Sequence, residues 1–430
     1  MATIHKDSDA TDTAPKTRRS GASEGRNLVI LCDGTGNELG GALSDTASDI
    51  RISNVLKLYR IAEKGQRQLV YYTPGVGTVG RVDWLSRSKQ KFLGVLGLVT
   101  GYGLDDNVLG AYRFLAENWR EGDRIYLFGF SRGAWTARVL AGLLHLIGLV
   151  QPSQLNMCDN ALATYKRAAR DDRLPIAWHF ARVIGARFPI IHFVGVWDSV
   201  ASVLVPRSDR MWIPSLETLP YTRNNPSVRI FRHALALDER RRMFRVAGWA
   251  QPQRFVANRF RPDETAEQNI EQRWFAGVHS DIGGGYREDE SALSKIPLIW
   301  MVEEAAKAGL RITRANLRKF ALGEQRAPDE YLYSAPDPGG AMHKSLTLGW
   351  KPLEIIPKRI KYREARRRSF LGFYFPLAEP RPVAENHVVD PSVRERQRRD
   401  PAYRPVNAPV LAAPPGGDPT AAEPDSKDPR

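Results

Sequence analysis

The sequence has little cysteine and no long apolar run. Its only cysteines are Cys32 and Cys158, so a chain of 430 residues has no disulfide framework and no cysteine-only zinc site. The longest nearly uncharged apolar stretch covers 92–104, well short of the roughly 20 residues that cross a bilayer as a helix. These absences exclude a disulfide-rich scaffold and a polytopic membrane protein, and they favour a reducing compartment.

The N-terminus lacks the apolar core that a signal peptide needs. We therefore expect a cytoplasmic protein, for which non-classical secretion stays open. Residues 1–26 are polar and aperiodic, and residues 409–430 are rich in proline, alanine and glycine, so both are expected to be disordered. This leaves 27–408 as one predicted folded domain.

Acidic residues are too few to balance the basic ones. Against 63 lysines and arginines stand 48 aspartates and glutamates, a net charge of +15. Much of the surplus lies in 351–404. Neither an RNA-recognition signature, nor a zinc finger, nor a basic leucine zipper accompanies it, so we expect no nucleic-acid partner. The charge fits a solvated face, an anionic substrate or peripheral contact with an anionic membrane.

Strand-like and helix-like segments alternate along the chain. Short apolar runs predict strands at 27–32, 69–72, 124–130, 189–197, 243–249 and 273–275. Apolar residues at helical spacing predict helices at 53–64, 105–119, 136–149 and 291–308, the last capped by Ser291. The alternation predicts an α/β fold, a mostly parallel sheet with helices on both faces. Segments near 150–188, 200–228 and 310–380 interrupt it and are expected to be insertions that form a cap.

The motif Gly129-Phe-Ser131-Arg-Gly133 stands between a predicted strand and a predicted helix. That context is the one a nucleophile elbow requires, because a tight turn with small flanking residues projects the serine above the sheet edge. The following helix directs its N-terminal dipole at developing negative charge. Ser131 is therefore the predicted nucleophile.

A serine nucleophile needs a base to take its proton. His279 lies where a predicted strand runs into the sequence HSDIGGGY, which we expect to be a loop too rich in glycine for a helix. Such a loop delivers a side chain to the carboxyl edge of the sheet. His279 is the predicted base, and His233 is the alternative.

The base in turn needs an orienting acid. Asp198 directly follows a buried strand, at the edge where ligands bind in open α/β sheets. The order Ser131, Asp198, His279 is the chain order of α/β-hydrolases. Asp281 and Asp238 stay open as rivals for the acid.

Acyl transfer also needs two backbone N–H donors for the oxyanion. One is expected from Arg132, which follows the nucleophile, and the other from the loop Gly34-Thr35 after the first strand. Asp33 is expected to support that loop or to contact the histidine. The sequence Asp33-Gly34-Thr35 also occurs in aspartyl-phosphate phosphatases. Those enzymes need their nucleophilic aspartate two residues before that aspartate, where this chain has Leu31.

These motifs together resemble one family. The blocks GDRIYLFGFSRGAWTAR, GVWDSV, HALALDERRRMFR and WFAGVHSDIGGGY follow in its order within 27–408. They are similar to the family of α/β-hydrolases that includes the phospholipase effectors of type VI secretion. The resemblance implies a serine hydrolase of α/β-hydrolase fold, with Ser131, Asp198 and His279 as its triad and lipid esters as substrates. It leaves any immunity or secretion partner open.

The residues themselves leave two other functions open. Asp33, Asp198, His279 and Asp281 could hold a divalent ion in a metal-dependent phosphoesterase, since oxygen and imidazole ligands suit such ions. An inert module that binds an anionic partner through the basic segment is the second alternative. The serine mechanism, by contrast, needs no metal and no organic cofactor.

The apolar stretch 92–104 has a candidate role in the leading interpretation. It is expected to line an acyl pocket or form a lid, with Arg87, Lys89 and Lys91 beside it facing anionic head groups. The alternative is a glycine-rich segment of the core.

Overall fold

The computed structural model describes the chain in ranges separated by gaps. The described residues are 25–34, 51–75, 103–170, 174–200, 204–206, 214–216, 219–257, 261, 263–324, 332–359 and 369–407. Both predicted disordered ends lie outside these ranges, apart from Gly25 and Arg26. Of the apolar stretch 92–104, only Gly103 and Leu104 are described.

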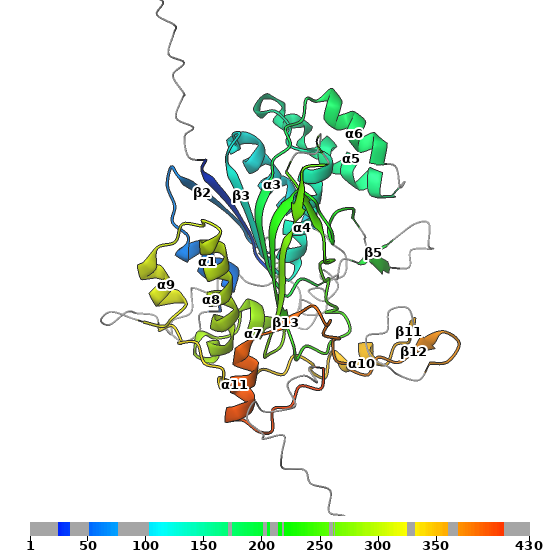
Figure 1. Ribbon diagram of the computed structural model, residues 1–430. Coiled ribbons are helices and arrows are strands. Elements are labelled where there is room, and N and C mark those ends of the chain that lie inside the picture. The colour runs from blue at the N-terminus through cyan, green and yellow to red at the C-terminus, as the bar shows by residue number, and fades with distance from the viewer. Residues whose placement is uncertain are drawn as a thin grey trace, which may run out of the picture.

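A seven-stranded sheet runs through the described part of the chain (Figure 1), in the order β13-β10-β7-β4-β3-β1-β2. Its strands are β1 (Asn27–Cys32), β2 (Gln68–Thr73), β3 (Arg124–Phe130), β4 (Ile191–Trp197), β7 (Val228–Ala236), β10 (Asn269–Phe275) and β13 (Val388–Val389). Every pair of neighbours is parallel. The predicted α/β fold with a mostly parallel sheet is therefore confirmed.

Consecutive residues of the central strands enter opposite apolar layers. In β1, Leu28 and Ile30 belong to one core cluster, whereas Val29 and Leu31 belong to another. Side chains alternate across a strand, so a run without polar residues is buried on both faces. This explains why NLVILC contains no alternation of apolar and polar residues.

Helices cover both faces of the sheet. The first face carries α3 (Leu104–Asn118), α4 (Arg132–Leu146) and α5 (Cys158–Arg170). The second carries α1 (Asn54–Ile61), α8 (Ala292–Lys307) and α9 (Arg314–Phe320). Ser291 precedes α8 as expected, but its hydroxyl donates to the Arg287 carbonyl (2.8 Å) instead of capping the helix.

The remaining elements are short or peripheral. They are the α-helices α6 (Leu174–Val183), α7 (His279–Gly283), α10 (Lys351–Glu354) and α11 (Pro391–Arg399), the 3₁₀ helices η2 (Pro152–Met157) and η4 (Glu288–Glu290), and the hairpin strands β5 (Leu204–Pro206) and β6 (Pro214–Leu216), β8 (Arg254–Val256) and β9 (Thr265–Glu267), and β11 (Lys358–Arg359) and β12 (Phe373–Tyr374). No helix in the described ranges is long and apolar enough to cross a bilayer.

The predicted strand at 243–249 is wrong. This segment forms only an isolated bridge, between Val246 and Val200, while the sheet position beside β4 belongs to β7. β7 was missed because Arg232 and His233 interrupt its apolar pattern. Both side chains are buried. The Arg232 guanidinium donates to Glu304 (2.8 Å) and His233 Nε2 accepts the Ser199 N–H (3.0 Å), partners that a local sequence pattern does not reveal.

Two of the expected insertions, 150–188 and 310–380, lie in different parts of the fold. In segment 150–188, α5 packs against α3, α4 and α6, which extends the helical layer on one face (Figure 1). Segment 310–380 instead supplies His343 and Trp350, whose partners border the carboxyl edge of the sheet. Of these two insertions, the later one supplies the side chains that approach the predicted site.

Candidate active site

Ser131 stands in a strained turn between β3 and α4. Its φ is +56°, a region that few non-glycine residues occupy. A Cβ atom at Gly129 would lie 2.3 Å from the Gly133 carbonyl oxygen, and one at Gly133 would lie 2.1 Å from the Cys32 carbonyl oxygen. The turn therefore needs glycine at both flanking positions, as the motif predicts. α4 begins at Arg132, earlier than the expected start at 136.

The serine, the histidine and the aspartate meet in one hydrogen-bonded chain. Ser131 Oγ lies 2.8 Å from His279 Nε2, and His279 Nδ1 lies 2.5 Å from Asp198 Oδ2. Ser131 follows β3, Asp198 follows β4, and His279 comes four positions after the end of β10. Because these strands are parallel, their carboxyl ends deliver all three side chains to the same edge of the sheet.

His279 is the first residue of α7, a short helix. The expectation of a loop without helix is therefore wrong, although the glycines do follow immediately: Gly284 has a φ of +77° and ends the helix. The rings of Phe130 and Phe244 pack on the imidazole, with centroids 4.7 and 4.8 Å away. Burial lowers the pKa of His279 below its ordinary value, against the opposing effect of Asp198, so the ring is neutral at pH 7.

Asp198 is held by more than the histidine. Its Oδ1 accepts the backbone N–H of Ala236 (3.0 Å), and the Arg381 guanidinium donates to both carboxylate oxygens (2.7 and 3.1 Å). Arg381 also donates to the carbonyls of Ala236 and Phe244. Burial would raise the pKa of Asp198, but the charge of Arg381 and the hydrogen bonds from His279 and Arg381 hold it well below its ordinary value. The carboxylate is therefore ionised and fixed in orientation.

Arg381 was not found from the sequence. It lies 183 positions after Asp198, in the stretch EPRPV, which has no motif that marks a functional residue. In the sequence it is only one of the many basic residues in 351–404. The geometry alone identifies it as a partner of the buried acid.

The two rival acids have other partners. Asp281 bonds through Oδ1 to His343 Nδ1 (2.7 Å) and accepts the Val278 N–H through Oδ2 (3.0 Å). Asp238 accepts the Gly277 N–H (2.7 Å). Asp281 and Asp238 therefore both hydrogen-bond to the turn that leads into α7, whereas Asp198 is the aspartate that bonds to the His279 imidazole. The alternative base His233 is buried and bonds through Nε2 to the Ser199 N–H (3.0 Å).

An ion pair borders the histidine. Glu239 accepts the backbone N–H of His279 (3.3 Å) and two guanidinium hydrogen bonds from Arg241 (3.0 and 2.8 Å). Burial would raise the pKa of Glu239, but the bonds and charge of Arg241 bring it down to about 2. The Arg241 guanidinium lies 3.6 Å from the ring centroid of Phe244 and 5.2 Å from that of Trp350. Glu239 and Arg241 lie in the block HALALDERRRMFR, but the sequence alone assigned no role to either of them.

The end of β1, from which the predicted oxyanion loop continues, lies beside the turn at Ser131. The Cβ that Gly133 lacks would lie 2.5 Å from the Asp33 carbonyl oxygen, so the end of β1 touches the first turn of α4. The Gly34 N–H donates to Asp33 Oδ1 (2.6 Å), and Asp33 Oδ2 accepts the hydroxyls of Ser53 and Tyr72. Asp33 therefore bonds to the first residue of the predicted loop, and its support of that loop stays a prediction. Thr35 lies outside the described residues, as do Arg87, Lys89 and Lys91.

The four residues of the phosphoesterase alternative do not converge. Asp33 bonds to hydroxyls, Asp198 pairs with His279 and Arg381, and Asp281 pairs with His343. Within the described ranges, three or more metal-ligating side chains do not cluster anywhere. Hydrogen-bond donors of the protein therefore already bond to the carboxylates that would have to be metal ligands in a phosphoesterase.

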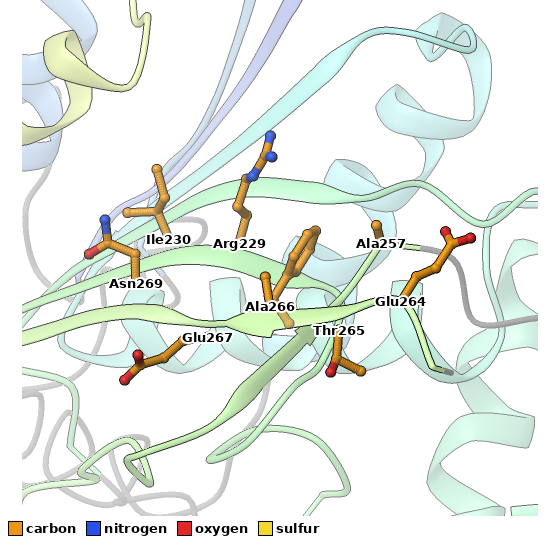
Figure 2. Close-up of a pocket in the computed structure, with 9 residues that line it drawn as sticks. Arg229, Ile230, Ala257, Glu264, Thr265, Ala266, Glu267 and Asn269 are labelled. Atoms are coloured by element: carbon orange, nitrogen blue, oxygen red, sulfur yellow. The ribbon is translucent and has the colours of Figure 1, made fainter. Parts of the chain in front are cut away.

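A separate hollow lies at the opposite edge of the sheet (Figure 2). It has a volume of about 490 Å³ between the β8–β9 hairpin and the amino ends of β7 and β10. Its lining residues are Arg229, Ile230, Phe255, Ala257, Glu264, Thr265, Ala266, Glu267 and Asn269. It contains none of the predicted site residues, and ligands of α/β sheets bind at the other edge.

Comparison with known proteins finds one similar curated sequence, two similar solved structures and one family. The uncharacterized protein YEL023C of Saccharomyces cerevisiae is 35% identical over 240 residues, which cover 53% of this chain and 33% of that protein. The match thus spans a third of the length of that relative. A crystal structure of an uncharacterized protein from Pseudomonas aeruginosa aligns with 67% of this chain and 46% of its own, at 20% identity and a TM-score of 0.33.

The structure of the Tle1 effector bound to the VgrG spike of the type 6 secretion system aligns with 67% of this chain and 57% of its own, at 19% identity and a TM-score of 0.31. Neither structural alignment adds to the description of the site. The sequence pattern of the Tle1-like phospholipase effector catalytic domain of type VI secretion matches residues 26–304, more than half of the chain. The chain therefore belongs to the Tle1-like phospholipase effector family of type VI secretion.

Proposed function

We propose that this protein is a serine hydrolase that cleaves carboxylic esters of lipids, phospholipids among them, through an acyl-enzyme. The observation that carries the proposal is the chain from Ser131 Oγ through His279 to Asp198, with distances of 2.8 and 2.5 Å. A hydroxyl, a neutral imidazole and an ionised carboxylate in this order are the parts of nucleophilic acyl transfer. Family membership supports lipid esters as the substrate class.

In the first half-reaction, Ser131 Oγ bonds to the ester carbonyl carbon while His279 Nε2 takes the hydroxyl proton. The carbonyl π electrons move to oxygen and form a tetrahedral oxyanion. When this collapses, the bond to the alcohol oxygen breaks and Nε2 returns the proton to that oxygen. In the second half, water attacks the acyl-enzyme with the same proton transfers, which release the acid and restore Ser131.

Charge stabilisation comes from the first turn of α4. The backbone N–H of Arg132 follows the nucleophile, and the N-terminal dipole of a helix from Arg132 to Leu146 points at the same place. The second backbone N–H donor to the oxyanion stays a prediction, and it is expected from the loop Gly34-Thr35. Gly34 could serve only if its N–H turned away from Asp33 Oδ1.

The proposal is tested by a fluorophosphonate probe, which phosphonylates activated serines. Wild-type protein should be labelled and Ser131→Ala should not, whereas the matched variant Ser280→Ala, in α7, should keep the label. A panel of soluble esters and phospholipids then defines the substrate. Labelling of Ser131→Ala would contradict the proposed nucleophile, and activity that a chelator abolishes would favour the metal-dependent phosphoesterase.

A further inference from the structure

Exposed apolar side chains gather on one arm of the molecule. We call residues 351–359 and 369–377 the apolar arm; it comprises α10 and the β11–β12 hairpin, which extends away from the sheet (Figure 1). The large apolar side chains exposed on it are Ile355, Ile356, Phe370, Leu371, Phe373, Phe375 and Leu377. Phe370 and Leu371 form its turn and are 78% and 81% exposed. Such a concentration marks an interaction surface.

The arm is built to present these side chains outward. Phe370 and Phe373 exchange backbone hydrogen bonds (2.8 and 2.9 Å) across a turn in which Leu371 has a φ of +48°. Tyr374 is buried and its hydroxyl donates to Glu379 (2.6 Å). Because side chains alternate along an extended chain, anchoring Tyr374 leaves Phe373 and Phe375 exposed on the opposite side.

The arm is also fastened to the loop that borders His279. The buried carboxylate of Glu354 in α10 accepts the backbone N–H of Arg242 (2.7 Å), and the Arg242 guanidinium donates to the Ile356 carbonyl. Two positions after Arg242, the ring of Phe244 packs on the imidazole. The arm and the hydrogen-bonded triad therefore lie at the same end of the sheet.

Charge indicates the kind of surface that the arm fits. Lys351 in α10 is exposed, and the nine residues of sequence that join β11 to Ser369 (IKYREARRR) include five basic residues and one acidic one. Exposed apolar side chains that are joined in sequence to a surplus of basic residues fit the boundary of an anionic bilayer. At such a boundary apolar side chains enter the headgroup region and basic side chains are attracted to phosphate.

We propose that the apolar arm docks the protein on anionic lipid surfaces, with Phe370, Leu371 and Phe375 entering the bilayer boundary. The choice of a lipid partner rests on the proposed lipid-ester hydrolase, because the arm lies beside the site that would receive the substrate. Docking itself needs no turnover and is tested without it.

The test is sedimentation with vesicles of phosphatidylcholine, alone or with phosphatidylglycerol, in a Ser131→Ala background. The test variant is Phe370→Ser with Leu371→Asn, since asparagine tolerates the positive φ at this position. The matched control is Trp178→Ser with Val183→Ser, two exposed apolar residues of α6. The arm variant should reduce partition into the anionic vesicles on the order of tenfold. The control should bind as the parent does, and all three should melt at the same temperature.

Three results would overturn the docking proposal. The first is that the arm variant and the parent partition equally into anionic vesicles. The second is vesicle binding that depends neither on phosphatidylglycerol nor on salt concentration. The third is a dimer in solution that the arm variant converts to a monomer without any vesicle binding, which would assign the arm to a second copy of the chain. If the arm binds vesicles but Ser131→Ala still hydrolyses lipid, the proposed nucleophile fails while docking stands.

Discussion

Replacing Arg381 tests the electrostatics of the candidate site most directly. The side chains of Arg381 and Asp198 are 3% and 1% exposed, and two guanidinium hydrogen bonds join them. Arg381→Gln removes the charge and leaves a buried carboxylate that only His279 and the Ala236 N–H then satisfy. Breaking a buried pair in this way costs about 3–5 kcal/mol, a large part of the 5–15 kcal/mol typical of a folded domain.

The same change should move the pH dependence of turnover. With Arg381 absent, the charge of Asp198 acts on His279 without compensation and raises the pKa of the imidazole. The base works when it is neutral, so the acid limb of kcat/KM should shift to higher pH, by up to about one unit. A merely structural role for Arg381 would lower stability and leave this limb in place.

The assay combines denaturant unfolding with kcat/KM for a soluble ester from pH 4.5 to 8.5. Arg381→Lys is the matched control because it keeps the charge but not the bidentate geometry. It should lose part of the stability and retain the acid limb of the wild type. An Arg381→Gln protein with wild-type stability and an unshifted limb would refute the reasoning.

The remaining predictions concern the other members of the site. Ser131→Ala should lower esterase activity on the order of 10³-fold or more with little loss of stability, measured by initial rates and thermal melts. Asp198→Asn should cost orders of magnitude in kcat, and Asp281→Asn much less; the reverse order would show that the acid is wrongly assigned. The hydrogen bond to Asp281 raises the pKa of His343, so this pair stabilises the fold below pH 6.5 and is lost as pH rises through the raised value. Unfolding of Asp281→Asn and wild type should therefore differ more at pH 5.5 than at pH 8.5.

Sequence motifs pointed to those residues of the candidate site whose positions depend on their neighbours in the chain. Ser131 could be proposed because a glycine, a serine and a glycine at fixed spacing, between a predicted strand and a predicted helix, indicate one tight turn. Asp198 could be proposed because a buried strand ends one residue before it. The error at 243–249 has the opposite cause: β7 carries the buried Arg232 and His233, whose hydrogen-bond partners Glu304 and Ser199 lie far away in the sequence.

The position of Arg381 shows how far sequence motifs reach into this site. The family pattern ends at residue 304, after the proposed nucleophile, acid and base, whereas Arg381 and β13 come later. Yet Arg381 holds both oxygens of the acid, and β13 pairs with β10, the strand that leads to His279. The triad geometry in this chain is therefore completed by a segment outside the matched pattern. A variant in this later segment should alter the pH dependence of a reaction whose reacting residues all precede it.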